Sequence, residues 1–291
     1  MTRLLTLGCS WVKGIGASYD NTKKYTRDEY RKFSFDNEQR KYSFTTLLCK
    51  KYKLDHVDIS AGGAANNSQA RKLKRYLLAN DLNDTIVMWG ITSIYRDEMY
   101  FTDTKKHHSF QPNQKVDLRK TGRSNWCGPK EHFNLHFDEE MAISLLTSDI
   151  CHWQKHFELA GCEQMWFDTL NTITYAEYRG HSLHKPFCEM PYPCNKDLLS
   201  QLAYKNGWDP IDDKYHSSDW RADCDRIKLL EQKGVVNPYS FHPTRQGHEQ
   251  IAEILDPIFE KYYNRHKSNN PNPSLYKTLW HKSYQVSNYD D

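Results

Sequence analysis

The sequence lacks several features that would place it in a class at once. Its eight cysteines include no Cys-X-X-Cys pair, which disfavours a zinc ribbon. No apolar run is long enough to cross a bilayer, and the lysines and arginines are spread along the chain without forming a basic block. We therefore expect no metal or cofactor, no membrane insertion and no nucleic-acid partner.

A secretory leader is also missing, because no basic start runs into a long apolar core. We therefore expect a cytoplasmic protein whose cysteines are reduced. The net charge is only +3 and the mean hydropathy is −0.87, yet 13% of the residues are aromatic. This combination is typical of a compact core that carries long polar loops.

The first third of the chain alternates between strand and helix patterns. The predicted elements are a strand at 3–9, a helix at 43–53, a strand at 56–59, a helix at 66–80 and a strand at 84–89. Ser43 is in position to cap the first of these helices, and Asn66 or Asn67 begins the second. This alternation predicts a parallel sheet with right-handed crossovers, an α/β fold of the flavodoxin-like α/β/α sandwich class.

The same alternation returns in the second half. The predicted elements there are a helix at 138–160, a strand at 163–168 and helices at 219–233 and 245–263. Two polar, aromatic stretches at about 97–137 and 171–218 show no period. We therefore predict one domain over residues 1–263 that carries these two insertions, followed by a polar C-terminal tail at 264–291.

Three separated segments are predicted to meet at one edge of the sheet. Gly8-Cys9-Ser10 stands at the end of the first strand, Gly62-Gly63-Ala64-Ala65-Asn66-Asn67 follows the second, and His242-Pro243 precedes the last helix. Open α/β sheets bind ligands at the carboxyl ends of their strands. This placement suggests Ser10 as a nucleophile and His242 as the general base that takes its proton.

These segments resemble the sequence blocks of the SGNH (GDSL-type) hydrolase family, in particular its Gly-Cys-Ser variants in tailed bacteriophages. The family's Gly-Asp-Ser stands here as Gly8-Cys9-Ser10, its glycine as Gly63, its Gly-X-Asn-Asp as Gly90-Ile91-Thr92-Ser93 and its Asp-X-X-His as Tyr239-Ser240-Phe241-His242. The resemblance covers residues 3–95 and 219–262 in outline. It implies an SGNH hydrolase-like fold and an oxyanion hole made by the amides of Ser10 and Gly63 with Thr92, for which Asn67 could substitute.

Two positions depart from the family pattern. Thr92 stands where the family has an asparagine amide donor, and a hydroxyl has a shorter reach. Tyr239 stands at the position of the acid and cannot hold imidazolium by charge. The groups that could orient His242 instead are Ser240, the Asn237 side chain, a backbone carbonyl, Asp168, Asp223 and Asp225.

Other histidines are expected to be structural. We interpret His248 as a packing or capping residue of the last helix, and Arg245 as part of a solvated helix start. The pairs His132/His136 and His152/His156 have i, i+4 spacing but lack the third ligand, or the glutamate after the first histidine, that zinc sites need.

The resemblance implies a serine esterase that removes an acyl group, acetyl above all, from a small molecule or a glycan. The alternative is a virion structural or binding protein on a catalytically weakened scaffold, with the tail at 264–291 contacting a protein partner in the virion. A third hypothesis is an acyltransferase that uses the same Ser10–His242 pair with a sugar acceptor.

Overall fold

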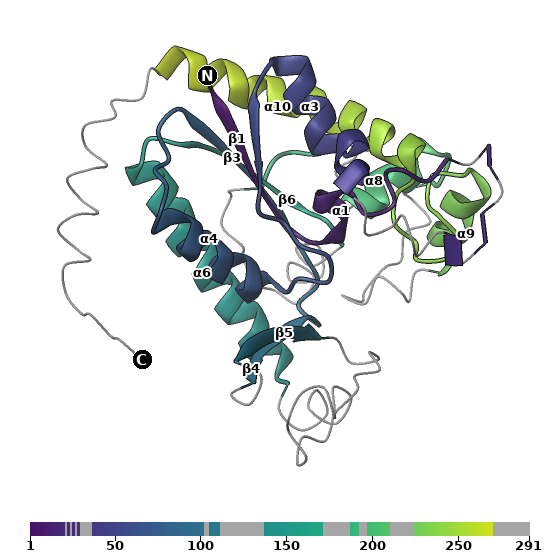
Figure 1. Ribbon diagram of the computed structural model, residues 1–291, viewed down its shortest axis with the longest axis horizontal. Helices are drawn as coiled ribbons and strands as arrows, with labels where there is room; N and C mark the ends of the chain where they lie inside the picture. Colours follow the sequence, from purple (N-terminus) through teal and green to yellow (C-terminus); the bar gives the residue numbers. More distant parts are fainter. Residues whose placement is uncertain are drawn as a thin grey trace.

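A parallel sheet with helices on both faces forms the centre of the protein (Figure 1). The computed structural model describes residues 1–20, 22–23, 25–26, 28–29, 37–101, 105–110, 137–170, 187–191, 197–209 and 224–269. The sheet has the order β2-β1-β3-β6, and every neighbouring pair in it is parallel. Its strands are β1 (Arg3–Leu7), β2 (Asp55–Asp58), β3 (Thr85–Ile91) and β6 (Glu163–Asp168). This order is that of flavodoxin-like sheets, so the predicted fold class is confirmed.

The helices form two layers. Those that pack on one face are α1 (Ser10–Lys13), α3 (Phe44–Tyr52), α8 (Leu198–Lys205), α9 (Cys224–Gln232) and α10 (Arg245–Asn269). A 3₁₀ helix, η1 (Asn37–Tyr42), directly precedes α3 in the chain. The opposite face is covered by α4 (Asn66–Leu77) and α6 (Glu139–Leu159) (Figure 1). Strand residues alternate between the two layers, because successive side chains of a strand point to opposite faces.

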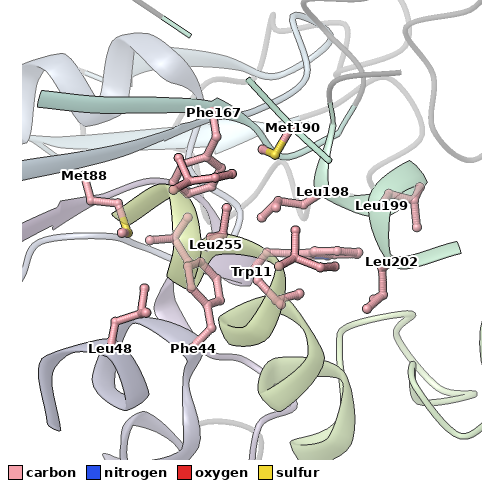
Figure 2. Close-up of a cluster of buried hydrophobic side chains, with 14 of the residues drawn as sticks. Trp11, Phe44, Leu48, Met88, Phe167, Met190, Leu198, Leu199, Leu202 and Leu255 are labelled. Carbon is pink, nitrogen blue, oxygen red and sulfur yellow. The ribbon is translucent and has the colours of Figure 1, made fainter. Parts of the chain in front are cut away.

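Each face of the sheet has its own apolar core. Met88 and Phe167 contribute to the core between the sheet and helices α3 and α10, and Leu255 of α10 belongs to the same cluster (Figure 2). Trp89 and Trp166 lie on the other face, and their rings stack with centroids 4.8 Å apart. Because both faces are covered, β3 is buried over its whole length.

Local signals placed several helix ends correctly. Ser43 caps α3, and its Oγ accepts a hydrogen bond from the Thr46 amide. The cap of α4 is Ala65, however, and Asn66 is the first helical residue, with its side chain turned to another segment. The last helix ends at Asn269, so the first six residues of the predicted tail are helical.

The stretch at 97–137 contains structure that its sequence did not predict. Strands β4 (Asp97–Phe101) and β5 (Lys106–Phe110) form an antiparallel hairpin. Arg71 of α4 fixes this hairpin, since its guanidinium donates to both oxygens of Glu98 at 2.8 and 2.7 Å.

Much of the predicted insertions, and the tail from residue 270, lie outside the described residues. The proposed division of the chain therefore stays a prediction. No helix in the described ranges is both long and apolar enough to span a membrane.

Candidate active site

Ser10 begins a one-turn helix directly after the first strand. Gly8 joins the two with a φ of +152°, and a Cβ there would lie 2.3 Å from Val12 Cγ2, so this turn requires glycine. The Gly8 amide donates to Gln69 Oε1 (3.2 Å), and its carbonyl accepts from the Ala61 amide (3.0 Å). These bonds hold Ser10, which is 4% exposed, at the carboxyl end of β1.

The glycine turn after β2 packs onto the segment that follows Ser10. A Cβ on Gly62 would lie 2.6 Å from Ile15 Cδ1, and the Ile15 amide donates to the Ser10 carbonyl (2.9 Å). Gly63 is exposed with a left-handed φ of +69°, and a Cβ there would meet no atom within 4 Å. The Gly63 backbone therefore borders open space near the Ser10 turn.

Asn66, the first residue of α4, forms two hydrogen bonds with the segment that follows β3. Its Nδ2 donates to the Thr92 carbonyl (2.8 Å), and its Oδ1 accepts from the Thr92 amide (2.9 Å). Asn67 is exposed, and its Nδ2 donates to Asp97 Oδ1 (3.1 Å). Asn66 thus sets the position of Thr92, and the oxyanion roles of Thr92 and Asn67 stay predictions.

Asn237 organises the loop that carries His242. It is fully buried, its Oδ1 accepts from the amides of Tyr239 (3.2 Å) and Ser240 (2.8 Å), and its Nδ2 donates to the His242 carbonyl (2.9 Å). Tyr239, at the position of the expected acid, donates its hydroxyl to the carbonyl of Tyr25 instead. The loop therefore directs the Tyr239 side chain to a different segment.

The His242 loop packs on the turn that follows α1. A Cβ on Gly16 would lie 3.0 Å from His242 Cβ and 2.6 Å from the Pro243 carbonyl oxygen. The topology therefore brings Ser10 and His242 to one edge of the sheet from opposite ends of the chain. No hydrogen bond joins Ser10 Oγ to the His242 ring among the described contacts, and such catalytic bonds are often long before substrate binds.

The His242 ring has a neutral hydrogen-bond partner. Its Nδ1 lies 2.7 Å from Ser240 Oγ, and Ser240 Oγ donates to Asn237 Oδ1 (3.0 Å). A hydroxyl has one proton and an amide oxygen has none to give, so Ser240 must accept from Nδ1–H. Nε2 is then left without a proton, which is the tautomer that a general base needs.

Neither described aspartate offered as a substitute acid contacts His242. Asp168, at the end of β6, accepts from the Leu170 amide (3.1 Å), and Asp225 pairs with a lysine on the surface of α9. Asp223 lies outside the described residues. Of the groups proposed from sequence, the fold brings the Ser240 hydroxyl and the Ser240 backbone to the ring, and Asn237 contacts the ring through that hydroxyl.

Burial and a nearby positive charge keep the His242 ring neutral. Burial, together with the Arg96 guanidinium, lowers the pKa of His242 to about 4, and a hydrogen bond to the Ser240 backbone partly opposes them. Arg96 lies five residues after the end of β3, in a segment without periodicity. The sequence therefore did not predict that Arg96 lies near His242.

A pocket of about 300 Å³ lies beside this edge. Asn66, Asn67 and Arg96 provide polar groups of its lining, and the apolar side comes from α6, including Met141 and Leu145. These last two side chains are 59% and 60% exposed. Mainly apolar pockets with a few polar groups are typical ligand sites.

His248 is a packing residue, as predicted. It is fully buried and stacks on the Phe44 ring (centroids 5.8 Å apart), and its Nδ1 accepts from the Phe44 amide (3.4 Å). Arg245 is less solvated than predicted, because its guanidinium lies 3.9 Å from the centroid of the Tyr42 ring. The described residues contain no cluster of three or more ligand side chains arranged to hold a metal ion.

Comparisons with known proteins find distant likenesses in solved structures. No family model and no curated protein matches the chain. A protein described as lipolytic and of the G-D-S-L family, from Desulfitobacterium hafniense DCB-2, is 9% identical with a TM-score of 0.43, over 89% of this chain and 99% of that one. The esterase EstA from a Pseudoalteromonas species is 11% identical with a TM-score of 0.42, over 91% and 100%. A carbohydrate esterase, described as having divergent catalytic and non-catalytic binding functions at its active site, is 8% identical with a TM-score of 0.40, over 89% and 68%.

Proposed function

We propose that the chain is a serine ester hydrolase in which Ser10 is the nucleophile and His242 the general base. The observation that carries the proposal is the hydrogen-bond chain from His242 through Ser240 to Asn237. It leaves Nε2 as a proton acceptor at the edge of the sheet where the Ser10 turn ends. Nucleophilic acyl transfer requires at least a serine hydroxyl and a histidine in that tautomer close enough to accept its proton.

The reaction follows from these positions. Ser10 Oγ bonds to the acyl carbon while its proton passes to His242 Nε2, and the carbonyl electron pair moves onto oxygen. The amides of Ser10 and Gly63 donate to that oxyanion. His242 then gives the proton to the departing alcohol, and water hydrolyses the acyl-enzyme by the same steps.

The neutral partner of His242 sets a limit on the rate. A carboxylate stabilises the imidazolium that forms in the transition state, whereas the Ser240 hydroxyl only orients the ring. Losing the acid function lowers kcat by about 10⁴-fold in a serine protease. We therefore propose a slow esterase, with enough base strength left for turnover.

An acetyl ester of a carbohydrate is the proposed substrate. The polar side of the neighbouring pocket, with the carboxylates of Asp138 and Asp149, suits sugar hydroxyls, and the apolar side from α6 suits a ring face. Release of acetate from a per-O-acetylated monosaccharide, measured against p-nitrophenyl acetate, tests this preference separately from the chemistry.

The chemistry is tested by the burst of p-nitrophenol from p-nitrophenyl acetate. Ser10→Ala and His242→Ala should abolish both burst and turnover. Ser60→Ala is the matched control, because Ser60 also follows a strand of the sheet but bonds only to nearby Asp58. Equal turnover by wild type and both site variants would refute the proposal.

A binding or structural protein on a weakened hydrolase scaffold is the second candidate, including a virion component. The observation that favours it is that His242 has no carboxylate partner among the described residues. Truncation after Asn269 should then abolish assembly or partner binding while the unfolding transition is unchanged. Unaltered assembly by the truncated chain would count against it.

A further inference from the structure

Arg96 has an unused hydrogen-bond donor next to the site. Its Nη1 is buried and has no hydrogen-bond partner within the described part of the chain. The same side chain lines the pocket together with Asn66, which holds Thr92 in place. Because a buried donor without a partner is unfavourable, such an atom at a site needs its own explanation.

The asparagine side chains that line the pocket are already engaged. Asn66 uses its Nδ2 and Oδ1 on the Thr92 backbone, and Asn67 donates to Asp97. At Thr92 the chain has a short hydroxyl in place of a longer amide. Arg96 Nη1 and Gln69 Nε2 are buried N–H donors without a partner near this edge among the described residues, and of the two only Arg96 lines the pocket.

The charges of the pocket indicate where a negative ligand atom could sit. Asp97, Asp138 and Asp149 also line the pocket, and they would repel a substrate that carries a fixed anionic group across it. A negative charge that forms beside His242 would meet Arg96 with less opposition, because Arg96, and none of these carboxylates, is the charged group that acts on the His242 ring. This arrangement favours the transient oxyanion over an anionic substrate.

Resting on the proposed function, we propose that Arg96 is the side-chain donor of the oxyanion hole, beside the amides of Ser10 and Gly63. When the Ser10 Oγ–carbon bond forms, the carbonyl π pair moves to oxygen, and an Arg96 N–H donates to it. The Ser10 proton is then on His242 Nε2. When the tetrahedral adduct collapses, the bond to the leaving alkoxide breaks and His242 returns the proton to it, so Arg96 exchanges no proton.

Arg96→Met removes the charge and keeps most of the stem, and Arg96→Lys keeps the charge without the planar fork. With the neutral ester p-nitrophenyl acetate, Arg96→Met should lower kcat by about 10²–10³-fold, the usual loss for one oxyanion donor, and leave KM within about threefold. Arg96→Lys should recover about tenfold of this loss. Arg75→Met, at an exposed site on α4, is the matched control and should behave as wild type.

Binding of phenylboronic acid supplies a readout apart from turnover, since it forms a tetrahedral anion on a serine oxygen. Its affinity should fall with kcat in Arg96→Met and stay unchanged in Arg75→Met. Unchanged kcat and boronate affinity in Arg96→Met would overturn the inference. A loss of activity that Arg96→Met shows only with the anionic ester p-nitrophenyl hemisuccinate would overturn it too, because Arg96 would then bind a fixed negative charge of the substrate. If Arg96→Met does not fold, Arg96→Lys and Arg96→Gln carry the same comparison. A wild type that neither hydrolyses esters nor binds the boronate would refute the proposed function, and this inference with it.

Discussion

The Ser240 hydroxyl is the most informative single group to remove. It accepts from His242 Nδ1 at 2.7 Å and donates to Asn237 Oδ1 at 3.0 Å, so it alone connects the ring to the buried amide. In Ser240→Ala the ring loses this anchor and keeps the contact with the Ser240 backbone. We expect the loop to keep its fold, because the Asn237 bonds to the backbone remain.

The magnitude follows from the neutral character of the bond. A neutral intramolecular hydrogen bond contributes about 0.5–1.5 kcal/mol net, and about 1.4 kcal/mol corresponds to tenfold in rate. Ser240→Ala should therefore lower kcat/KM by about 2- to 13-fold. That is far less than the roughly 10⁴-fold loss seen where a charged partner of the histidine is replaced.

The assay is steady-state hydrolysis of p-nitrophenyl acetate between pH 4 and 9, with the unfolding midpoint measured on the same preparations. Ser240→Thr keeps the hydroxyl and is the matched control, expected within about twofold of wild type, since a retained hydroxyl preserves the bond.

Two results would refute the reasoning about Ser240. Activity unchanged in Ser240→Ala, with Ser10→Ala inactive, would mean that the hydroxyl does not orient the base. A loss of about 10⁴-fold in a folded Ser240→Ala protein would mean that Ser240 connects His242 to a charged group, on the scale of a lost acid.

Further predictions concern pH, stability and the two turns. Because the pKa of His242 is lowered to about 4, its ring stays unprotonated under mildly acidic conditions, and kcat/KM should begin to fall only as pH approaches 4. The pKa of His248 is lowered to about 3, so the unfolded state binds more protons between about pH 6.5 and 3. The free energy of unfolding should therefore fall on acidification by up to about 1.4 kcal/mol per pH unit, and His248→Gln should reduce the slope in pH-dependent denaturation. Gly63→Ala should lower the free energy of unfolding by only about 1–2 kcal/mol, which is the cost of an alanine in the left-handed conformation. If the Gly63 amide binds the oxyanion, the same substitution should reduce kcat more than tenfold, and denaturation and steady-state kinetics measure the two effects separately. Asn66→Ala should release Thr92 and lower kcat by about tenfold at a similar KM, whereas an effect on KM alone would contradict this role.

The fold could be predicted from local patterns because the sheet is buried on both faces. Strands such as β3 must then be apolar at nearly every position, and this pattern can be recognised without knowing which strands lie beside them. The cap of α3 at Ser43 was predictable for a similar reason, since its hydrogen bond spans only three residues. The β4–β5 hairpin was not, because its strands are polar and their anchor is the contact of Glu98 with Arg71.

The sequence by itself determined the parallel sheet and which segments end at its carboxyl edge, and it offered Ser240 and Asn237 among several partners for His242. Only the tertiary structure decided between them, since Tyr239 bonds to Tyr25 and the described aspartates turn elsewhere. It also brought Arg96 to the site. The physical reason is range: strand and helix patterns follow from the chemistry of adjacent residues, whereas the partner of a buried ring depends on how loops far apart in the chain pack together.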